Sequence, residues 1–234
     1  MTHSANPDAA GPDDSIDDAA PAEPSGEAPV AEAAGVVAAP TRKRPKPGER
    51  RVQILQTLAT MLEQPASDRI TTAALAARLD VSEAALYRHF ASKAQMFEGL
   101  IEFIEQSVFT LVNQIHERET VPQVQVHRIL TVLLQFGEKN PGMSRVMVGD
   151  ALVFENERLL ARMNQFFERF ESQLRQSLRG MAEAAGSDTP SVDANAQASV
   201  LTAFAVGRLQ RYARSGFKRS PTEFLDAALR MLAS

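Results

Sequence analysis

The chain has 234 residues, of which 44% are hydrophobic, and a formal net charge of −4, which is enough apolar material for one or two folded domains. It contains no cysteine, which excludes disulfides and thiolate metal sites. No run of about 18 apolar residues is present, and no basic residue precedes an apolar stretch at the N-terminus. We therefore expect neither a membrane span nor a secretory signal.

Charge is distributed unevenly along the chain. Residues 1–40 hold eight acidic residues and no Lys or Arg, with too few large apolar side chains to offset the entropy of ordering. We predict a disordered acidic tail there, which either competes with DNA for the basic segment or is an inert solubilising extension. Residues 41–93 hold ten basic and five acidic residues, a bias that favours a nucleic-acid partner.

A basic arm is predicted over residues 41–49, where prolines prevent a helix from starting before Gly48. Such an arm either reaches along DNA phosphates or is a solvated linker. Helical periodicity follows, and this first helix should stop near Gln64-Pro65. Its apolar stripe consists of Ile54, Leu55, Leu58, Ala59 and Leu62.

Two short helical patterns meet at a tight turn within residues 70–93. Thr71 or Thr72 can cap the first pattern and Ser82 the second, because a hydroxyl there accepts a free backbone N–H. Helices joined in this way form either a generic αα-corner or a helix-turn-helix, whose second helix lies in the major groove of DNA. The apolar residues of the two faces and the turn are Leu75, Ala76, Leu79, Val81, Leu86 and Phe90.

The remaining chain has the periodicity of helices throughout, and no segment alternates with period two. A capping box at Ser92-Lys93-Ala94-Gln95 predicts a helix of about 25 residues, and another helix should run from Pro122 to Asn140. Later helices are expected at Met143 to about Phe154, from Leu159 to about Ala185-Gly186, at Val192 to Ala213, and from a capping box at Ser220-Pro221-Thr222-Glu223. The sequence therefore predicts an all-α fold without a sheet.

The motif Val-Ser-x-x-x-Leu-Tyr-x-His-Phe-x-Ser-Lys, from Val81 to Lys93, resembles the signature of TetR-type regulators. Residues 83–90, 100–105 and 136–142 resemble the nucleoid occlusion branch of that family. The resemblance runs from about Arg50 to the C-terminus and leaves out the first forty residues.

The resemblance implies a TetR-like architecture with two parts. A three-helix head with the helix-turn-helix should occupy residues 50–93, and a helical body for dimerisation and partner binding should occupy residues 94–234. In this family the last two helices, here about 192–214 and 221–233, pair with their copies in a homodimer, although apolar terminal helices also pack within one subunit. Asp80 stands where many relatives carry Gly, and it tolerates a left-handed backbone better than most residues.

The recognition helix is expected from Ser82 to about Phe90. Arg88 can read guanine and Ala85 can touch a thymine methyl, whereas Tyr87 and Lys93 resemble the family's phosphate-contacting positions. His89 either contacts DNA or caps and stacks at the helix end. The full set of candidate DNA-binding residues is Arg50, Thr71, Thr72, Ser82, Glu83, Ala85, Tyr87, Arg88, His89 and Lys93.

The resemblance implies that dimers on specific palindromic sites of double-stranded DNA bind the C-terminal tail of the division GTPase FtsZ. They would thereby prevent Z-ring assembly over the nucleoid, which makes the expected location cytoplasmic and nucleoid-associated. The matching groove residues are Phe103, Leu111, Val132, Gln135 and Lys139. Leu111 and Val132 either line this groove or pack in the core, and helical periodicity slightly favours the core.

The alternative function is that of a TetR-type repressor that a small ligand releases from its operator. Such a repressor needs a closed cavity lined by aromatic and a few polar groups. The chain has no Trp and only two Tyr, which disfavours this alternative.

Catalysis is not expected. The four histidines are scattered and have no metal-ligand spacing, and no glycine-rich phosphate loop is present. We therefore predict neither an enzyme nor a cofactor or metal requirement.

Overall fold

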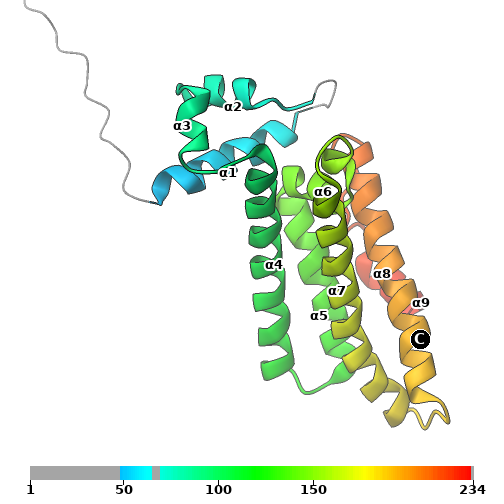
Figure 1. Cartoon of the computed structure of the whole chain (residues 1–234). Coiled ribbons are helices and arrows are strands. Elements are labelled where there is room, and N and C mark those ends of the chain that lie inside the picture. Colours follow the sequence, from blue (N-terminus) through cyan, green and yellow to red (C-terminus); the bar gives the residue numbers. More distant parts are fainter. Residues whose placement is uncertain (1–47, 65–68, 233–234) are drawn as a thin grey trace, which may run out of the picture. The chain divides into compact units, whose positions relative to one another are not determined.

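The computed structural model describes residues 48–64 and 69–232. The predicted acidic tail and residues 41–47 of the predicted arm lie outside the described residues. Within the described ranges every regular element is helical, which confirms the all-α prediction (Figure 1). The elements are α1 (Glu49–Leu62), α2 (Thr72–Leu79), α3 (Glu83–Tyr87), α4 (Lys93–Arg118), α5 (Pro122–Lys139), α6 (Pro141–Met147), the 3₁₀ turn η1 (Asp150–Leu152), α7 (Glu157–Ala184), α8 (Pro190–Arg214) and α9 (Leu225–Leu232).

The helix-turn-helix forms from local signals in the sequence. The Thr71 hydroxyl accepts the Ala74 N–H (3.1 Å) at the start of α2. The Ser82 hydroxyl accepts the Ala85 N–H (3.3 Å) at the start of α3. Between the two helices Asp80 has φ 55° and ψ 51°, the left-handed conformation that Asp tolerates. The predicted caps and the predicted backbone at Asp80 are therefore confirmed.

The head, which we define as α1–α3, has a small core of its own. Leu75 of α2, Leu86 of α3 and the adjacent Phe90 are each only 1% exposed, and Ile54 and Leu58 of α1 are fully buried. These five side chains fill the space among three short helices, none of which is long enough to be stable alone. Burial of this face therefore fixes the position of α3.

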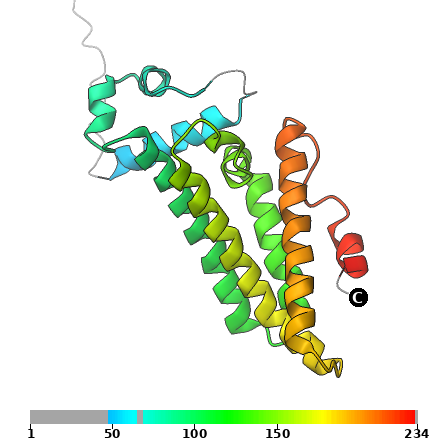
Figure 2. The same cartoon turned by 45° about the vertical axis from the view of Figure 1, so that its right-hand side comes forward.

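The body, which we define as α4–α9, is a bundle in which α7 packs along α8 and α5, and α4 packs against α5 and α7 (Figure 1). Ile104, Leu133, Leu134 and Phe170 are fully buried between these helices. The helix α9 packs beside α8 at the end of the chain, where it is drawn in red in Figure 2. In the described part of the chain, no helix is both long and apolar enough to cross a membrane.

Helix α6 joins the head to the body by direct contact with α1. A Cβ atom on Gly142 would lie 2.1 Å from the Ala59 carbonyl oxygen, so this approach requires glycine. Arg145 of α6 donates from Nη1 to the carbonyls of Leu62 (3.3 Å) and Gln64 (2.9 Å). The C-terminal end of α1 is thereby held by the body.

The predicted ends of two helices in the middle of the chain were wrong. The recognition helix ends at Tyr87 and not near Phe90, because the chain turns there so that Ser92 can adopt the extended conformation that caps α4. The helix expected from Met143 to about Phe154 is divided into α6 and η1. Gly149 has φ 82° between them, and this left-handed residue ends the first helix.

The predicted start of the last helix was also wrong. Residues 221–224 form turns, and α9 begins at Leu225. The hydroxyls of Ser220 and Thr222 both donate to the carboxylate of Glu138 at the end of α5, the second at 2.7 Å. Phe224 then has φ 53°, which no right-handed helix accommodates. A contact with α5 has therefore replaced the capping box.

Candidate nucleic-acid interface and partner groove

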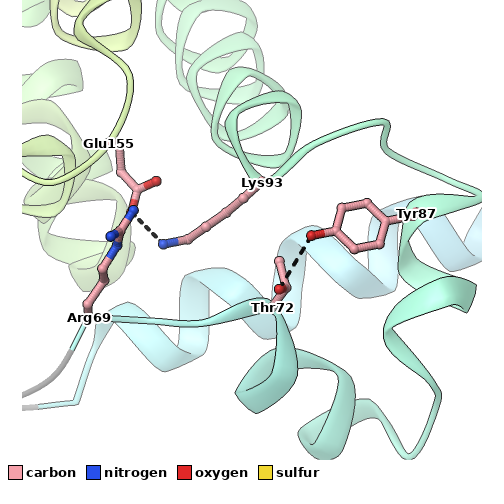
Figure 3. A network of polar contacts seen from close by, with 5 residues as sticks. All are labelled: Arg69, Thr72, Tyr87, Lys93 and Glu155. Atoms are coloured by element: carbon pink, nitrogen blue, oxygen red, sulfur yellow. Dashed lines mark hydrogen bonds and ion pairs between the residues drawn. The ribbon is translucent and has the colours of Figure 1, made fainter.

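Hydrogen bonds among three predicted DNA-binding residues tie α3 to the start of α2. The Thr72 hydroxyl donates to the Glu83 carboxylate at 2.5 Å. The Tyr87 hydroxyl donates to Thr72 Oγ at 3.5 Å (Figure 3). Tyr87 is 45% exposed, so its ring lies at the surface while its hydroxyl is directed toward α2. The Glu83 carboxylate thus accepts a hydrogen bond within the head, where it helps to hold α3 against the start of α2.

The remaining predicted residues of α3 and its end lie at the surface to different degrees. Ser82, Arg88 and His89 are exposed, and Ala85 is half-buried. Ser82 acts as the N-cap of α3. Arg88 is therefore the long cationic side chain that α3 and its C-cap present to solvent, at the position expected to read bases.

Arg51 of α1 is a residue of this region that the sequence interpretation missed. Its Nη1 donates to the His89 carbonyl at 2.6 Å, and its guanidinium lies 4.0 Å from the centre of the Phe90 ring. These contacts fix the segment that follows α3. The neighbouring Arg50, which was predicted, is half-buried and donates to Gln53 at 2.8 Å. No local sequence pattern distinguishes the two arginines.

Lys93, the predicted phosphate-contacting lysine, forms an ion pair with Glu155 (Figure 3). Arg69 Nε lies 3.7 Å from the same carboxylate oxygen. The Lys93 side chain is 17% exposed, the Glu155 side chain 7% and the Arg69 side chain 60%. Glu155 lies between η1 and α7, sixty-two positions after Lys93, so no sequence pattern indicated this cluster.

The predicted partner groove lies along α4 and α5. Phe103 and Leu111 of α4 are 46% and 44% exposed, respectively, so neither is a core residue in this chain. Val132 of α5 is half-buried and packs against the core. Phe136, which was not predicted, places its ring centre 6.1 Å from that of Phe103 at an angle of 45°. Two helices thus present a partly exposed apolar strip.

The polar residues predicted for the groove lie on α5, where Gln135 and Lys139 are exposed. Gln135 also lines a surface pocket of about 460 Å³ between α5 and the α9 segment. His127 and Asp226 on its wall form a contact of 2.8 Å. Gln135 therefore lies between the apolar strip and this pocket.

Helices α4 and α7 are joined by a series of charged contacts. Glu98 bonds to Arg158 at 2.9 Å, and Glu105 accepts two hydrogen bonds from Arg162 at 3.0 and 2.6 Å. The hydrogen bond to Glu105 raises the pKa of Arg162. Further along, the Arg169 guanidinium lies 3.9 Å from the centre of the Phe109 ring on α4. These contacts oppose sliding of α4 along α7.

Two family models match the chain. The model described as "Bacterial regulatory proteins, tetR family" matches residues 54–100, and the SlmA-like model described as "Tetracyclin repressor-like, C-terminal domain" matches residues 119–234. Together they cover most of the head and most of the body.

Among solved structures, the TetR family regulator PfmR from Thermus thermophilus gives a TM-score of 0.64 at 18% identity, covering 77% of this chain and 96% of that chain. The regulator FadR from Bacillus subtilis, in complex with stearoyl-CoA, gives a TM-score of 0.63 at 12% identity, covering 78% and 97%. At these identities the likeness shows the fold alone.

Curated relatives are much closer in sequence. The nucleoid occlusion factor SlmA of Photobacterium profundum is 50% identical over 190 residues, which is 81% of this chain and 96% of the relative. The protein of the same name from Colwellia psychrerythraea is 51% identical over 173 residues, which is 74% of this chain and 87% of the relative. The chain therefore belongs to the SlmA family of nucleoid occlusion factors, within the TetR-type fold.

Proposed function

We propose that this chain is a DNA-binding nucleoid occlusion factor. As a dimer on specific palindromic chromosomal sites it binds FtsZ and prevents assembly of the Z-ring and septum over the nucleoid. The observation that carries the proposal is the 50% identity over 190 residues to a protein named for that role. Because 190 residues exceed the head, the identity includes the body, where the partner groove would lie.

In this proposal the head contacts DNA through two classes of side chain. Arg88 is exposed at the end of α3, where it can form paired hydrogen bonds with guanine, and the methyl of Ala85 can contact thymine. Tyr87, Thr71 and Lys93 lie near helix ends and would contact phosphates, whose recognition fixes orientation and is independent of sequence. Ser82, Glu83 and Thr72 would hold this surface in place.

The proposed dimer uses the two last helices. Exposed apolar side chains are present on α8 and in the α9 segment, where Val192, Val200, Phe224 and Met231 are 64%, 50%, 77% and 81% exposed, respectively. Exposed apolar side chains of this size are typical of a surface that another protein covers. A two-fold dimer carries two equivalent heads, and this symmetry matches a palindromic site.

The proposed FtsZ site is the strip between α4 and α5. Phe103, Leu111 and Phe136 offer apolar contacts for an extended or helical peptide, and Phe103 has the partial exposure typical of an anchor residue. Lys139 at the end of α5 would attract an acidic group of the peptide. Gln135 would form its polar rim.

The ligand-released repressor is the weaker candidate. In that mechanism the helices of the body shift and change the spacing of the two heads. The paired contacts of Arg158 and Arg162 with α4 oppose such a shift of α4 against α7. The pocket beside α9 opens at the surface near exposed Phe224 and Asp226, unlike the enclosed cavity that a ligand-responsive repressor needs.

FtsZ polymer disassembly tests the proposed function. A specific duplex is first selected from genomic fragments by repeated binding to the purified chain. FtsZ polymers are then sedimented with the chain alone, with the selected duplex and with a scrambled duplex of equal length. We expect the selected duplex to lower the pelleted FtsZ most strongly. Equal pelleting in all three samples would contradict the proposal.

A further inference from the structure

The ion-pair cluster of Lys93, Arg69 and Glu155 connects the head to the body, and the proposed function gives Glu155 and Arg69 no role. Lys93 is the first residue of α4, Arg69 precedes α2, and Glu155 comes from the segment before α7 (Figure 3). Both cations approach the same carboxylate oxygen, Oε1 of Glu155. A residue of the body therefore engages the lysine that would contact DNA.

The burial of Glu155 explains why it needs these cations. Its side chain is 7% exposed, and a carboxylate removed from water is costly unless it is paired and hydrogen-bonded. Lys93 provides the closer partner, and its ammonium also lies 5.6 Å from the centre of the Phe97 ring. The Glu155 carboxylate thus forms the same kind of charged hydrogen bond with the Lys93 ammonium that a phosphate oxygen would form.

We propose that Glu155 is a positioning residue that sets the affinity for DNA by competing with the phosphate backbone for Lys93. This inference rests on the proposed DNA-binding function. When DNA binds, the Lys93 ammonium leaves Glu155 for a phosphate oxygen. Arg69 then becomes the main partner of Glu155, so the buried carboxylate remains paired with a cation.

The geometry of Arg69 suits this exchange. Its Nε lies 3.7 Å from Glu155 Oε1 in a loose contact, and its side chain is 60% exposed. It is therefore near enough to tighten into a paired contact, since a guanidinium presents several donors in one plane. Lys93 has a flexible four-carbon stem and retains 17% exposure, which leaves the ammonium a route toward solvent and phosphate.

One consequence concerns communication between the two parts of the protein. Because Arg69 belongs to the head and Glu155 to the body, the tightening of their contact on DNA binding changes a contact between head and body. Coupling between sites is reciprocal, so a change that moves the Glu155 segment also changes the affinity for DNA.

The salt dependence of DNA binding by full-length variants tests the inference. We expect Glu155→Gln to bind the selected duplex about fivefold more tightly. The slope of log affinity against log salt should differ from the wild-type slope by less than about 0.9, the value for one phosphate contact, because Lys93 contacts a phosphate in both complexes. Glu98→Gln is the matched control, because it removes the same charge near the start of α4 while its partner is Arg158. This control should change affinity less than twofold and leave the slope unchanged.

Two further variants distinguish the exchange of Lys93 from Glu155 to phosphate from a general effect of removing one negative charge. Adding Lys93→Ala to Glu155→Gln should abolish the gain in affinity. Arg69→Ala should weaken binding in the wild-type background and have a smaller effect in Glu155→Gln, because a neutral residue 155 needs no replacement partner. Arg69 is exposed, so this variant provides the test even if Glu155→Gln fails to fold. The neutral Glu155→Ala then replaces Glu155→Gln in the comparison.

Several outcomes would overturn the inference. These are an unchanged affinity in Glu155→Gln, a gain that persists without Lys93, an equal gain in Glu98→Gln, or an Arg69→Ala effect that is independent of residue 155. If the wild-type chain binds no duplex above the scrambled control, the proposed function fails as well. Wild-type binding with no effect of Glu155→Gln overturns this inference alone.

Discussion

The head and the partner groove reach their arrangements by different routes. In the head, hydroxyl caps at Thr71 and Ser82 and the left-handed Asp80 fix two helices from signals within a dozen residues. In the groove, Phe103 of α4 meets Phe136 of α5, and only the packing of two long helices brings them together. The head is thus defined by local sequence, whereas the groove depends on the whole bundle. Substitutions at the junction of head and body, in the groove and in the head test this difference.

The largest effect is expected at the junction of head and body. Gly142→Ala places a Cβ 2.1 Å from the Ala59 carbonyl oxygen, and the backbone of α1 has to move. Overpacking of this kind costs up to about 3 kcal/mol of unfolding free energy, measurable by urea denaturation.

Gly180→Ala is the control for that change, because its Cβ meets only the Pro122 side chain at 3.2 Å. It should alter the unfolding free energy by less than about 1 kcal/mol, since the gain in helix propensity offsets the close contact. Equal losses in the two variants would contradict the tight contact between α6 and α1.

The groove is tested by Phe103→Ala. This change removes a side chain that is 46% exposed, so the fold should persist, while binding of an FtsZ tail peptide should weaken by about 2 kcal/mol, as for an anchor residue. Affinity for the selected duplex should stay within twofold. Isothermal titration with peptide and with duplex measures both. Leu160→Ala, at a similarly exposed apolar position on α7 (46%), should leave peptide affinity unchanged.

Base reading in the head is tested by Arg88→Ala. If the exposed guanidinium contacts guanine, its loss should reduce discrimination against a substituted base by about 1.5 kcal/mol. Affinity for scrambled duplexes should fall much less. Competition binding with a set of single-base variants provides the measurement, and uniform weakening across the set would assign Arg88 to the phosphates.

The smallest effect is expected for Tyr87→Phe. This change removes the hydroxyl that donates to Thr72 at 3.5 Å and that would contact a phosphate. We expect binding to weaken by about 1 kcal/mol, as for one hydrogen bond, and to do so equally for selected and scrambled duplexes. A selective loss for one sequence would contradict the assignment to phosphate.

The sequence predicted the all-α fold, because caps, proline and helical periodicity act over short distances. It failed where a distant contact overrides a local signal. Ser220 has the context of a capping box, yet its hydroxyl donates to Glu138 of α5. The pairing of Lys93 with Glu155 has the same origin, since the two residues are sixty-two positions apart and neither one's neighbours indicate the other.

The candidate DNA-binding residues were found mainly from the motif between Val81 and Lys93, and the partner residues from resemblance alone. Periodicity favoured a core position for Leu111, but it is 44% exposed. Helical spacing shows which residues share a face; it does not show which neighbouring helix covers that face. The packing of α4 against α5 and α7 decides this.

We expect DNA bound at the head to promote capture of FtsZ at the groove. Fluorescence anisotropy of a labelled FtsZ tail peptide, titrated with the chain in the presence and absence of the selected duplex, tests it most directly. We predict tighter peptide binding with the duplex, and weaker peptide binding in Phe103→Ala. Equal peptide affinity with and without DNA would rule out coupling between head and groove, and an unchanged affinity in Phe103→Ala would rule out the groove as the peptide site.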